Sequence, residues 1–500
     1  MDFLRRLGAG LDSPSIPWKS LIITFAIGEY ALESYLSYRQ YKVLQRTRIP
    51  AQLKNEIDQK TFDKSQAYGR AKAKYGFVSG IWGQIKNVFV IRYDVYPKLW
   101  ALAGLWVTRF TPERFQGEIT QSLVFAFTYG LVETALGLPF SYYYHFVLEE
   151  AFGFNKQTLQ LWVSDLLKGQ ALSFAFGIPL GAAFLKIIQV TGDQFFFWIW
   201  LFTLAIQLGA ITIYPILIVP LFNKLTPLEP GTLKDRVEGL AARLEFPLDE
   251  LQIIDGSKRS AHSNAYFTGL PWKKKIVIYD TLIEKSEIKE VEAILAHELG
   301  HWKMGHTTKL IGISSGHLLA VFSLFSIFIR NQSLYEAFGF FKEKPIIIGF
   351  ILFNEVLSPT DSIIKLSMNV LTRRFEFEAG MLWLLPVFTC TCLLTRSRRR
   401  LLIQARLCRR AGLLSHQAPG PESFLHGMRP HALLPTLRIP LLITFVIQDA
   451  DWMYSSYHFS HPILTERLKA VGWTSEHKVS GDSKPSVETN GGTVAPKQEL

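Results

Sequence analysis

Long apolar stretches alternate with polar segments along most of this 500-residue chain. A helix needs about 20 predominantly apolar residues to cross the hydrocarbon core of a bilayer. Charged residues Lys86, Arg92, Asp94 and Lys98 interrupt one of the stretches and make it the weakest candidate. The pattern therefore predicts a mainly α-helical, polytopic membrane protein. Its seven predicted spans are 18–38, 84–106, 119–137, 170–190, 194–222, 307–330 and 345–371.

The charge of the connecting segments predicts the orientation. Residues 39–77 contain ten Lys and Arg against three acidic residues. Loops with such an excess stay on the cytosolic side of the membrane. Counting crossings forward then places 223–306 in the cytosol, and the chain after Leu371 returns to the same side.

Three carboxylates, those of Glu29, Glu33 and Glu133, lie inside apolar stretches. Acidic residues within membrane helices usually face the interior of the bundle or a water-filled cavity. The alternative is that the span limits are wrong by one turn. In either case we do not expect a sealed, lipid-facing surface at these positions.

Residues 223–306 form the one long segment with the pattern of a soluble domain. The apolar spacing of 233–244 predicts a helix, and 251–255 and 275–279 predict short strands on either side of a polar loop, 256–267. A further helix is predicted to begin near Ile288. The segment is therefore expected to be a cytosolic α+β domain.

The predicted helix contains His297-Glu298-Leu-Gly-His301. Residues four apart on a helix project from one face, so the two histidines can bind one metal ion. Neutral imidazole is a good zinc ligand, and Glu298 lies where it can take a proton from a zinc-bound water. The alternative, two surface histidines on an ordinary helix, is disfavoured by the apolar residues Val291 and Leu295 before the motif. The pattern predicts a zinc peptidase with one Zn²⁺ per chain.

A third ligand is expected from elsewhere on the same side of the membrane. Residues 373–378 follow the last span directly, and either Glu376 or Glu378 could supply a carboxylate. Spacing alone does not choose between them, and each could instead be a solvated acid at the membrane exit. His306 fits no ligand spacing, so we expect it to cap a helix or to lie at the surface.

Four separated motifs, which lie at residues 260–267, 297–306, 373–379 and 460–462, occur in the same order as in one known family. Together they resemble the eukaryotic zinc CAAX prenyl protease family, over residues 1–379 and again over 448–472. The resemblance implies seven helices around a water-filled chamber, closed by a cytosolic zinc domain. It also implies removal of the last three residues from prenylated CAAX proteins. In fungi the family also processes the a-factor pheromone precursor, and in animals prelamin A.

The resemblance assigns roles to individual residues. His297, His301 and Glu376 match the family's zinc ligands, and Glu298 matches the general base. Glu376 is favoured over Glu378 because the family has a Glu-x-x-x-Asp pattern at this point.

Three further residues match positions that contact substrate in the family. Asn264 matches the stretch that pairs with substrate as an added strand, with affinity from main-chain hydrogen bonds. His461 and Arg467 match residues that face the substrate carbonyl and the end of the peptide. Their chemistry suits an oxyanion or carboxylate partner, although residue type alone is equally consistent with a surface position.

The resemblance fails at Gly380, where the family has the Asp of its Glu-x-x-x-Asp pattern. In related zinc sites such an Asp receives the free ring N–H of a ligand histidine. Loss of a partner of this kind typically lowers metal affinity or activity about 10–100-fold. Glycine also weakens a helix by about 1 kcal/mol relative to alanine.

The composition changes abruptly over 381–447. This segment holds all three cysteines, nine arginines, no lysine and one acidic residue, and so carries +8 of the net charge of +12. It could be a basic arm for phosphates or membrane surfaces. It could also be an eighth span, but the apolar run at 381–394 is short and Pro386 interrupts it. We favour a third explanation, mistranslated text such as a retained intron, because the flanking motifs stay in register.

The rest of the chain is only weakly basic, and no nucleic-acid partner is indicated. The expected organisation has seven parts, from membrane helices to a disordered tail. They are helices with a cytosolic loop (1–222), the zinc peptidase domain (223–306), two more spans (307–371), the third-ligand segment (372–379), the anomalous segment (380–447), the C-terminal part of the peptidase domain (448–479) and the tail (480–500).

The leading hypothesis is a zinc endopeptidase of the endoplasmic reticulum membrane, with the inner nuclear membrane as a second location. Its expected partners are prenylated CAAX proteins and the lipid bilayer. Two alternatives stay open. One is a membrane quality-control metallopeptidase, since the His-Glu-x-x-His core does not select a prenylated substrate. The other is a catalytically crippled homologue that binds prenylated partners, which Gly380 motivates.

Overall fold

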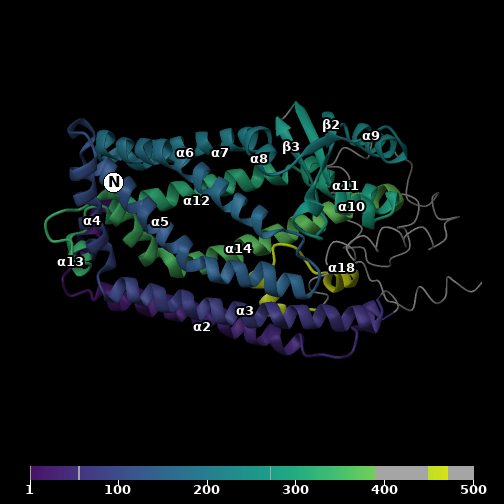
Figure 1. Cartoon of the computed structure of the whole chain (residues 1–500), viewed down its shortest axis with the longest axis horizontal. Helices are drawn as coiled ribbons and strands as arrows, with labels where there is room; N and C mark the ends of the chain where they lie inside the picture. Colours follow the sequence, from purple (N-terminus) through teal and green to yellow (C-terminus); the bar gives the residue numbers. More distant parts are fainter. Residues whose placement is uncertain (1, 55–56, 271, 389–448, 471–500) are drawn as a thin grey trace, which may run out of the picture.

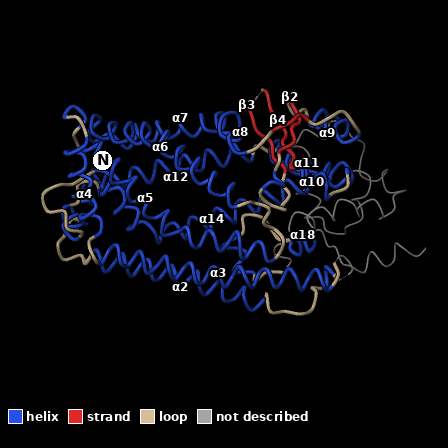
Figure 2. The backbone as a smooth tube through the Cα atoms, viewed as in Figure 1, coloured by secondary structure: helices blue, strands red, loops and turns tan. Residues whose placement is uncertain are grey.

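The computed structural model describes residues 2–54, 57–270, 272–388 and 449–470. Long helices run along the longest axis of the molecule, and all its described strands gather at one end (Figure 1) (Figure 2). The described helices are α1 (Asp2–Leu11), α2 (Trp18–Val43), α3 (Gln59–Arg92), α4 (Val95–Phe110), α5 (Glu118–Tyr143), α6 (Leu159–Thr191), α7 (Phe195–Ile213), α8 (Val219–Phe222), α9 (Thr232–Leu244), α10 (Asp280–Lys285), α11 (Ile288–Lys303), α12 (His306–Phe328), α13 (Gln332–Ala337), α14 (Ile346–Phe388), α17 (Trp452–His458) and α18 (Leu464–Ala470).

Four helical runs within the described residues are long and apolar enough to cross a membrane: Glu118–Glu149, Leu159–Phe222, His306–Phe328 and Ile346–Gly380. The second run is 64 residues long and contains both α6 and α7. These two helices pack against each other, and the chain turns between them at Gly192, whose φ is 56°. The expected number of seven spans is therefore not confirmed.

The span predicted at 84–106 is wrong as a single helix. α3 ends at Arg92 and α4 begins at Val95. Between them Asp94 adopts a left-handed conformation with φ 53°, and its carboxylate accepts a hydrogen bond from Lys19 Nζ at 2.5 Å. Charged residues that can find partners outside the helix favour such a break over a continuous apolar span.

The predicted cytosolic loop at 39–77 is largely helical. α2 extends to Val43, and α3 begins at Gln59, where the side chain of Asp58 accepts a hydrogen bond from the backbone N–H of Thr61. Lysine and arginine are good helix formers, so an excess of positive charge does not exclude a helix.

Each of the three carboxylates in apolar stretches meets a partner on another helix. This agrees with the expectation that they face other helices rather than lipid. The pairs are Glu29 with the hydroxyl of Ser362 (2.8 Å), Glu33 with Lys365 (2.8 Å) and Glu133 with Lys86. The water-filled chamber stays a prediction.

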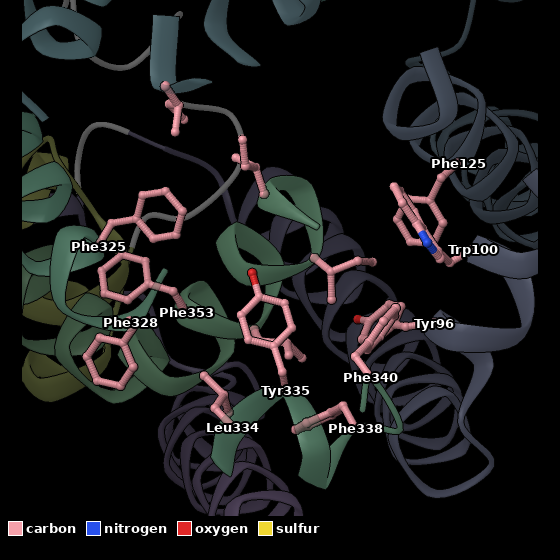
Figure 3. Close-up of a cluster of buried hydrophobic side chains, with 14 of the residues drawn as sticks. Tyr96, Trp100, Phe125, Phe325, Phe328, Leu334, Tyr335, Phe338, Phe340 and Phe353 are labelled. Carbon is pink, nitrogen blue, oxygen red and sulfur yellow. The ribbon is translucent and has the colours of Figure 1, made fainter. Parts of the chain in front are cut away.

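An aromatic core holds the helices together at the end of the molecule that lies away from the sheet (Figure 1) (Figure 3). Phe125, Phe325 and Phe353 are almost completely buried there. The buried Tyr335 also donates a hydrogen bond from its hydroxyl to the carbonyl of Pro345 at 2.9 Å. Helices in a membrane associate through close packing and hydrogen bonds between helices, and this cluster packs residues of α4, α5, α12, α13 and α14 against one another.

The strands form one four-stranded sheet in the order β1-β2-β4-β3. β2 and β4 are parallel, whereas the other two pairings are antiparallel. β2 and β4 agree with the two predicted strands, but the predicted loop at 256–267 was wrong to include the start of β3. Tyr, Phe and Thr are typical of strands, and this signal at 266–268 could have found it. The strands are β1 (Leu225–Pro227), β2 (Leu248–Ile254), β3 (Ala265–Leu270) and β4 (Lys273–Tyr279).

α11 begins at Ile288, as predicted. A capping box closes its first turn, in which Glu287 and Glu290 satisfy each other's backbone N–H groups. Its apolar face, including Leu295 and Leu299, is buried in the core of the sheet domain. The opposite side approaches α14 closely, because a Cβ at Gly300 would meet the carbonyl oxygen of Ala379 at only 3.2 Å.

Candidate metal centre

Two helices far apart in the sequence contribute the donor atoms of the site. α11 carries His297 and His301 on one face, and α14 carries Glu376, whose side chain is 4% exposed. The close approach of the two helices at Gly300 places this carboxylate beside both imidazoles. The predicted third ligand is thus brought to the motif by the packing of α14 on α11.

The donor atoms of His297, His301 and Glu376 all lie within 4.8 Å of one another. The two Nε2 atoms are 3.2 Å apart, and each lies 3.2 Å from an oxygen of Glu376. Ligands at about 2.0–2.1 Å from a tetrahedral zinc are separated by roughly 3.3–3.4 Å. Two imidazole nitrogens and one carboxylate oxygen at this spacing are a donor set that fits a catalytic zinc ion.

Glu376 is also contacted from the C-terminal part of the chain. His461 Nδ1 lies 2.7 Å from one of its oxygens, and Arg467 Nη2 lies 3.0 Å from the other. Hydrogen bonding to Glu376 raises the pKa of His461 above its usual value. Arg467 is fixed further by a hydrogen bond from its Nε to the carbonyl of Pro462 at 2.9 Å. His461 and Arg467, the two residues predicted to face substrate, therefore both contact the carboxylate of the predicted third ligand, Glu376.

Glu298 directly follows His297 in the sequence of α11. Burial raises the pKa of its carboxyl group, and the negative charge of Glu376 raises it further, whereas His297 and His301 act in the opposite direction. A carboxylate with a raised pKa is better matched to accept a proton near neutral pH. This is the property that a general base requires.

Glu378, the other candidate ligand, faces away from the donor cluster. Its Oε2 lies 3.3 Å from His306 Nε2, and its Oε1 accepts a hydrogen bond from Arg374 Nε at 3.1 Å. The two carboxylates, only two residues apart on α14, thus have different surroundings.

The expectation that His306 lies at the surface or caps a helix is wrong. It is 1% exposed, and its Nδ1 lies 3.0 Å from Nδ1 of His301. Its ring stacks on Phe375 with centroids 4.3 Å apart. Ligand spacing could not reveal this position, because His306 reaches His301 only through the turn at Gly305, whose φ is 66°.

Asn264 is exposed and immediately precedes β3, at the edge of the sheet, rather than lying in the donor cluster. Its side-chain oxygen accepts a hydrogen bond from the backbone N–H of Ala265 at 2.8 Å. Its carbonyl accepts one from the N–H of Tyr279 at 3.1 Å. It therefore fixes the start of an edge strand, and its predicted pairing with substrate stays a prediction.

The helix that holds Glu376 continues past Gly380 to Phe388, so Gly380 does not end it. Among the residues that the structure describes, no atom would lie within 4 Å of a Cβ built at Gly380. The position that carries Asp in the family pattern is therefore open to a larger side chain. Most of the anomalous segment, with Cys390, Cys392 and Cys408, and the whole of the predicted tail lie outside the described residues.

Two family models match nearly all of the chain. Residues 40–224 match the N-terminal domain of CAAX prenyl proteases, described as five membrane helices, and α3 to α7 lie within this range. Residues 227–474 match peptidase family M48. The fold and the donor cluster thus belong to a multi-pass membrane metallopeptidase.

Individual relatives narrow this class. CAAX prenyl protease 1 of Saccharomyces cerevisiae is 41% identical over 94% of this chain and 98% of its own length. The human CAAX prenyl protease 1 homolog is 34% identical over 91% of this chain and 95% of its own. The crystal structure of S. mikatae Ste24p aligns with a TM-score of 0.76 and 40% identity, over 92% of this chain and 99% of that one. This chain belongs to the CAAX prenyl protease 1 family.

Proposed function

We propose that this chain is a zinc endopeptidase of the endoplasmic reticulum membrane that removes the C-terminal tripeptide of prenylated CAAX proteins. One observation carries the proposal. His297, His301 and Glu376 present three donor atoms within 4.8 Å of one another, in a chain whose relatives are named CAAX prenyl protease 1 over almost its whole length. Membership of the M48 family implies a metal, and the donor set favours zinc.

Five residues of the site carry out three tasks in this proposal. His297, His301 and Glu376 hold the ion, which when bound supplies Lewis acidity and a water of lowered pKa. Glu298 accepts the proton of the attacking water and returns it to the leaving amine. Arg467 holds the carboxylate of Glu376 and offers its remaining guanidinium N–H groups to the C-terminal carboxylate of the peptide.

The edge strand β3 offers a place for the extended peptide. β3 pairs with β4 on one side, and it is the last strand of the described sheet. A substrate that adds a strand at such an edge gains main-chain hydrogen bonds irrespective of its side chains. Asn264, at the start of β3, would then mark where the substrate strand begins, and the prenyl chain would lie among the apolar helices.

The zinc domain is proposed to lie on the cytosolic side. The basic region 39–77 supports this orientation through the positive-inside rule. The packing of α11 against α14 supports a shared side for the zinc domain and the C-terminal end of α14. CAAX termini are prenylated on soluble proteins before they reach membranes, so a cytosolic centre is also where such a substrate arrives.

The test uses the purified full-length chain in lipid nanodiscs. We expect one zinc per chain and release of the last three residues from a farnesylated CAAX peptide, but not from the same peptide without its lipid. Cleavage of both peptides, or of misfolded membrane proteins, would favour a quality-control peptidase. A metal-free chain that still binds the farnesylated peptide would favour a non-catalytic binder, the alternative that Gly380 motivates.

A further inference from the structure

The buried histidine at the start of α12 is not used by the mechanism above. His306 lies between His301, the second proposed ligand, and Glu378 on α14. Gly305, with φ 66°, provides the turn that folds α12 back on the end of α11. Phe375 then covers one face of the imidazole with nearly parallel rings, at an interplanar angle of 5°. The ring is therefore held in one orientation.

The two ring nitrogens of His301 face different partners. Nε2 lies in the donor cluster, 3.2 Å from His297 Nε2 and from Glu376 Oε1. A histidine that binds a metal through Nε2 carries its proton on Nδ1. That Nδ1 lies 3.0 Å from Nδ1 of His306, so it donates and His306 Nδ1 accepts.

This tautomer of His301 determines which ring nitrogen of His306 carries a proton. A neutral His306 that accepts at Nδ1 must carry its proton on Nε2. Nε2 lies 3.3 Å from Glu378 Oε2, a carboxylate that accepts hydrogen bonds when ionised. The other oxygen of this carboxylate, Glu378 Oε1, accepts a hydrogen bond from Arg374 Nε at 3.1 Å.

We propose that His306 and Glu378 are positioning residues that form a relay, Glu378–His306–His301, which fixes the ring orientation and tautomer of His301 for metal binding. Metal-ligating histidines usually donate their second N–H to such a partner, which also increases their basicity. Gly380 has no side chain that could accept the ring N–H of a ligand histidine. In the relay, His306 accepts this N–H from His301. The inference rests on the proposed function, because it requires that His301 Nε2 binds the metal.

Zinc affinity of the full-length chain, measured by competition with a chromophoric chelator, tests the relay without any need for cleavage. His306→Phe keeps an aromatic ring against Phe375 but removes both hydrogen bonds, and we expect zinc affinity to fall about 10–100-fold. His306→Asn keeps an acceptor for His301 Nδ1, so it should recover most of the loss. Glu378→Gln should weaken binding less than His306→Phe and add little to it in the double variant.

A matched control separates the relay from packing. His317→Phe makes the same substitution further along α12, and we expect it to leave zinc affinity unchanged. With Co²⁺ in place of zinc, the visible spectrum of His306→Phe should shift relative to wild type, because the orientation of one ligand has changed. The His317→Phe spectrum should not.

Three outcomes would overturn the relay. They are a His306→Phe variant with wild-type zinc affinity, a His306→Asn variant as weak as His306→Phe, or additive effects of His306→Phe and Glu378→Gln. If His306→Phe does not fold, the Glu378→Gln variant still tests the relay. The relay requires this variant to bind zinc more weakly than wild type, and an unchanged zinc affinity would overturn it. A wild-type chain that binds zinc but cleaves no prenylated peptide would overturn the proposed function and leave the relay standing.

Discussion

The two sides of the candidate metal centre are built in different ways. On one side α11 supplies His297, Glu298 and His301 from five consecutive residues of one helix, closed by its own capping box and buried in the sheet domain. On the other side Glu376 lies 79 residues from His297. It is contacted by Arg467, a further 91 residues along the chain.

This second side is held by contacts between α14 and the C-terminal helices. Arg373 forms an ion pair with Glu466 at 2.6 Å, and Glu466 also accepts a hydrogen bond from Ser455 at 2.9 Å. Asn369 donates to the carbonyl of Tyr457 at 2.5 Å. Because Glu376 is held by contacts between distant segments, we expect substitutions far from the site to change the position of Glu376 more than that of the histidines on α11.

The largest effect on peptide cleavage is expected from a substitution on the α11 side. Glu298→Gln removes the base but keeps the shape of the side chain, so peptide cleavage should fall about 10²–10⁴-fold. Zinc content, measured by elemental analysis, should stay at the wild-type level because no ligand has changed. Loss of zinc in this variant would mean that Glu298 supports the metal rather than the proton transfer.

Gly380→Asp sharpens the comparison from the Glu376 side. No described residue would crowd a side chain at this position. A carboxylate there is expected to hold the ring N–H of a ligand histidine and raise zinc affinity about 10–100-fold. Gly380→Ala is the matched control, because it strengthens the helix by about 1 kcal/mol without adding a carboxylate. Equal zinc affinities for the two variants would exclude the carboxylate effect.

Arg467→Lys keeps the charge but removes the planar group that contacts both Glu376 and Pro462. Lysine cannot make both contacts at once, so we expect zinc affinity to fall about 10-fold. Chelator competition and steady-state kinetics distinguish two roles. A raised KM with unchanged zinc affinity would assign Arg467 to the peptide end alone.

The smallest effect concerns the attachment of α17. Arg39 on α2 binds Asp451 through two contacts, at 3.0 and 2.8 Å. Asp451→Asn keeps the cap of α17 but loses the ion pair, and because Arg39 is partly exposed we expect only a small loss of thermal stability. Thermal unfolding measures this, and zinc affinity should decrease slightly with it.

Glu292→Gln provides the matched change on the α11 side. Glu292 pairs with Arg236 at 2.9 Å and with Arg243 at 3.3 Å, so the variant removes two ion pairs. We expect a similar loss of stability but no change in zinc affinity. A larger effect on zinc than in Asp451→Asn would contradict the comparison between the two sides.

The Asp451 pair also has a pH dependence of defined sign. Its hydrogen bond with Arg39 lowers the pKa of Asp451 below its usual value. A carboxyl group with a lowered pKa in the folded state stabilises the fold above its unfolded pKa, and this contribution is lost as the pH falls through the lowered value. The difference in thermal stability between wild type and Asp451→Asn should therefore shrink under acid conditions.

Several elements could be predicted from the sequence because their signals are local. The motif on α11, the start of that helix at Ile288 and the strands β2 and β4 all follow from spacing within a few residues. The charged residues marked the span at 84–106 as the weakest, but the contact of Asp94 with Lys19 could not be predicted, because Lys19 lies on another helix. The burial of His306 was missed for the same reason, since Phe375 and Glu378 come from α14.

The sequence by itself determined the family, the apolar helices and the two imidazoles with their neighbouring base, because helical periodicity places residues four apart on one face. The family resemblance favoured Glu376, but only the tertiary structure shows its carboxylate beside the two imidazoles, with Glu378 in contact with His306 instead. It also placed His461 and Arg467 on the same carboxylate. The physical reason is that these side chains meet through the packing of α11, α14 and α18. Helical periodicity gives the direction of a side chain on its own helix, but not which side chains of other helices lie opposite it.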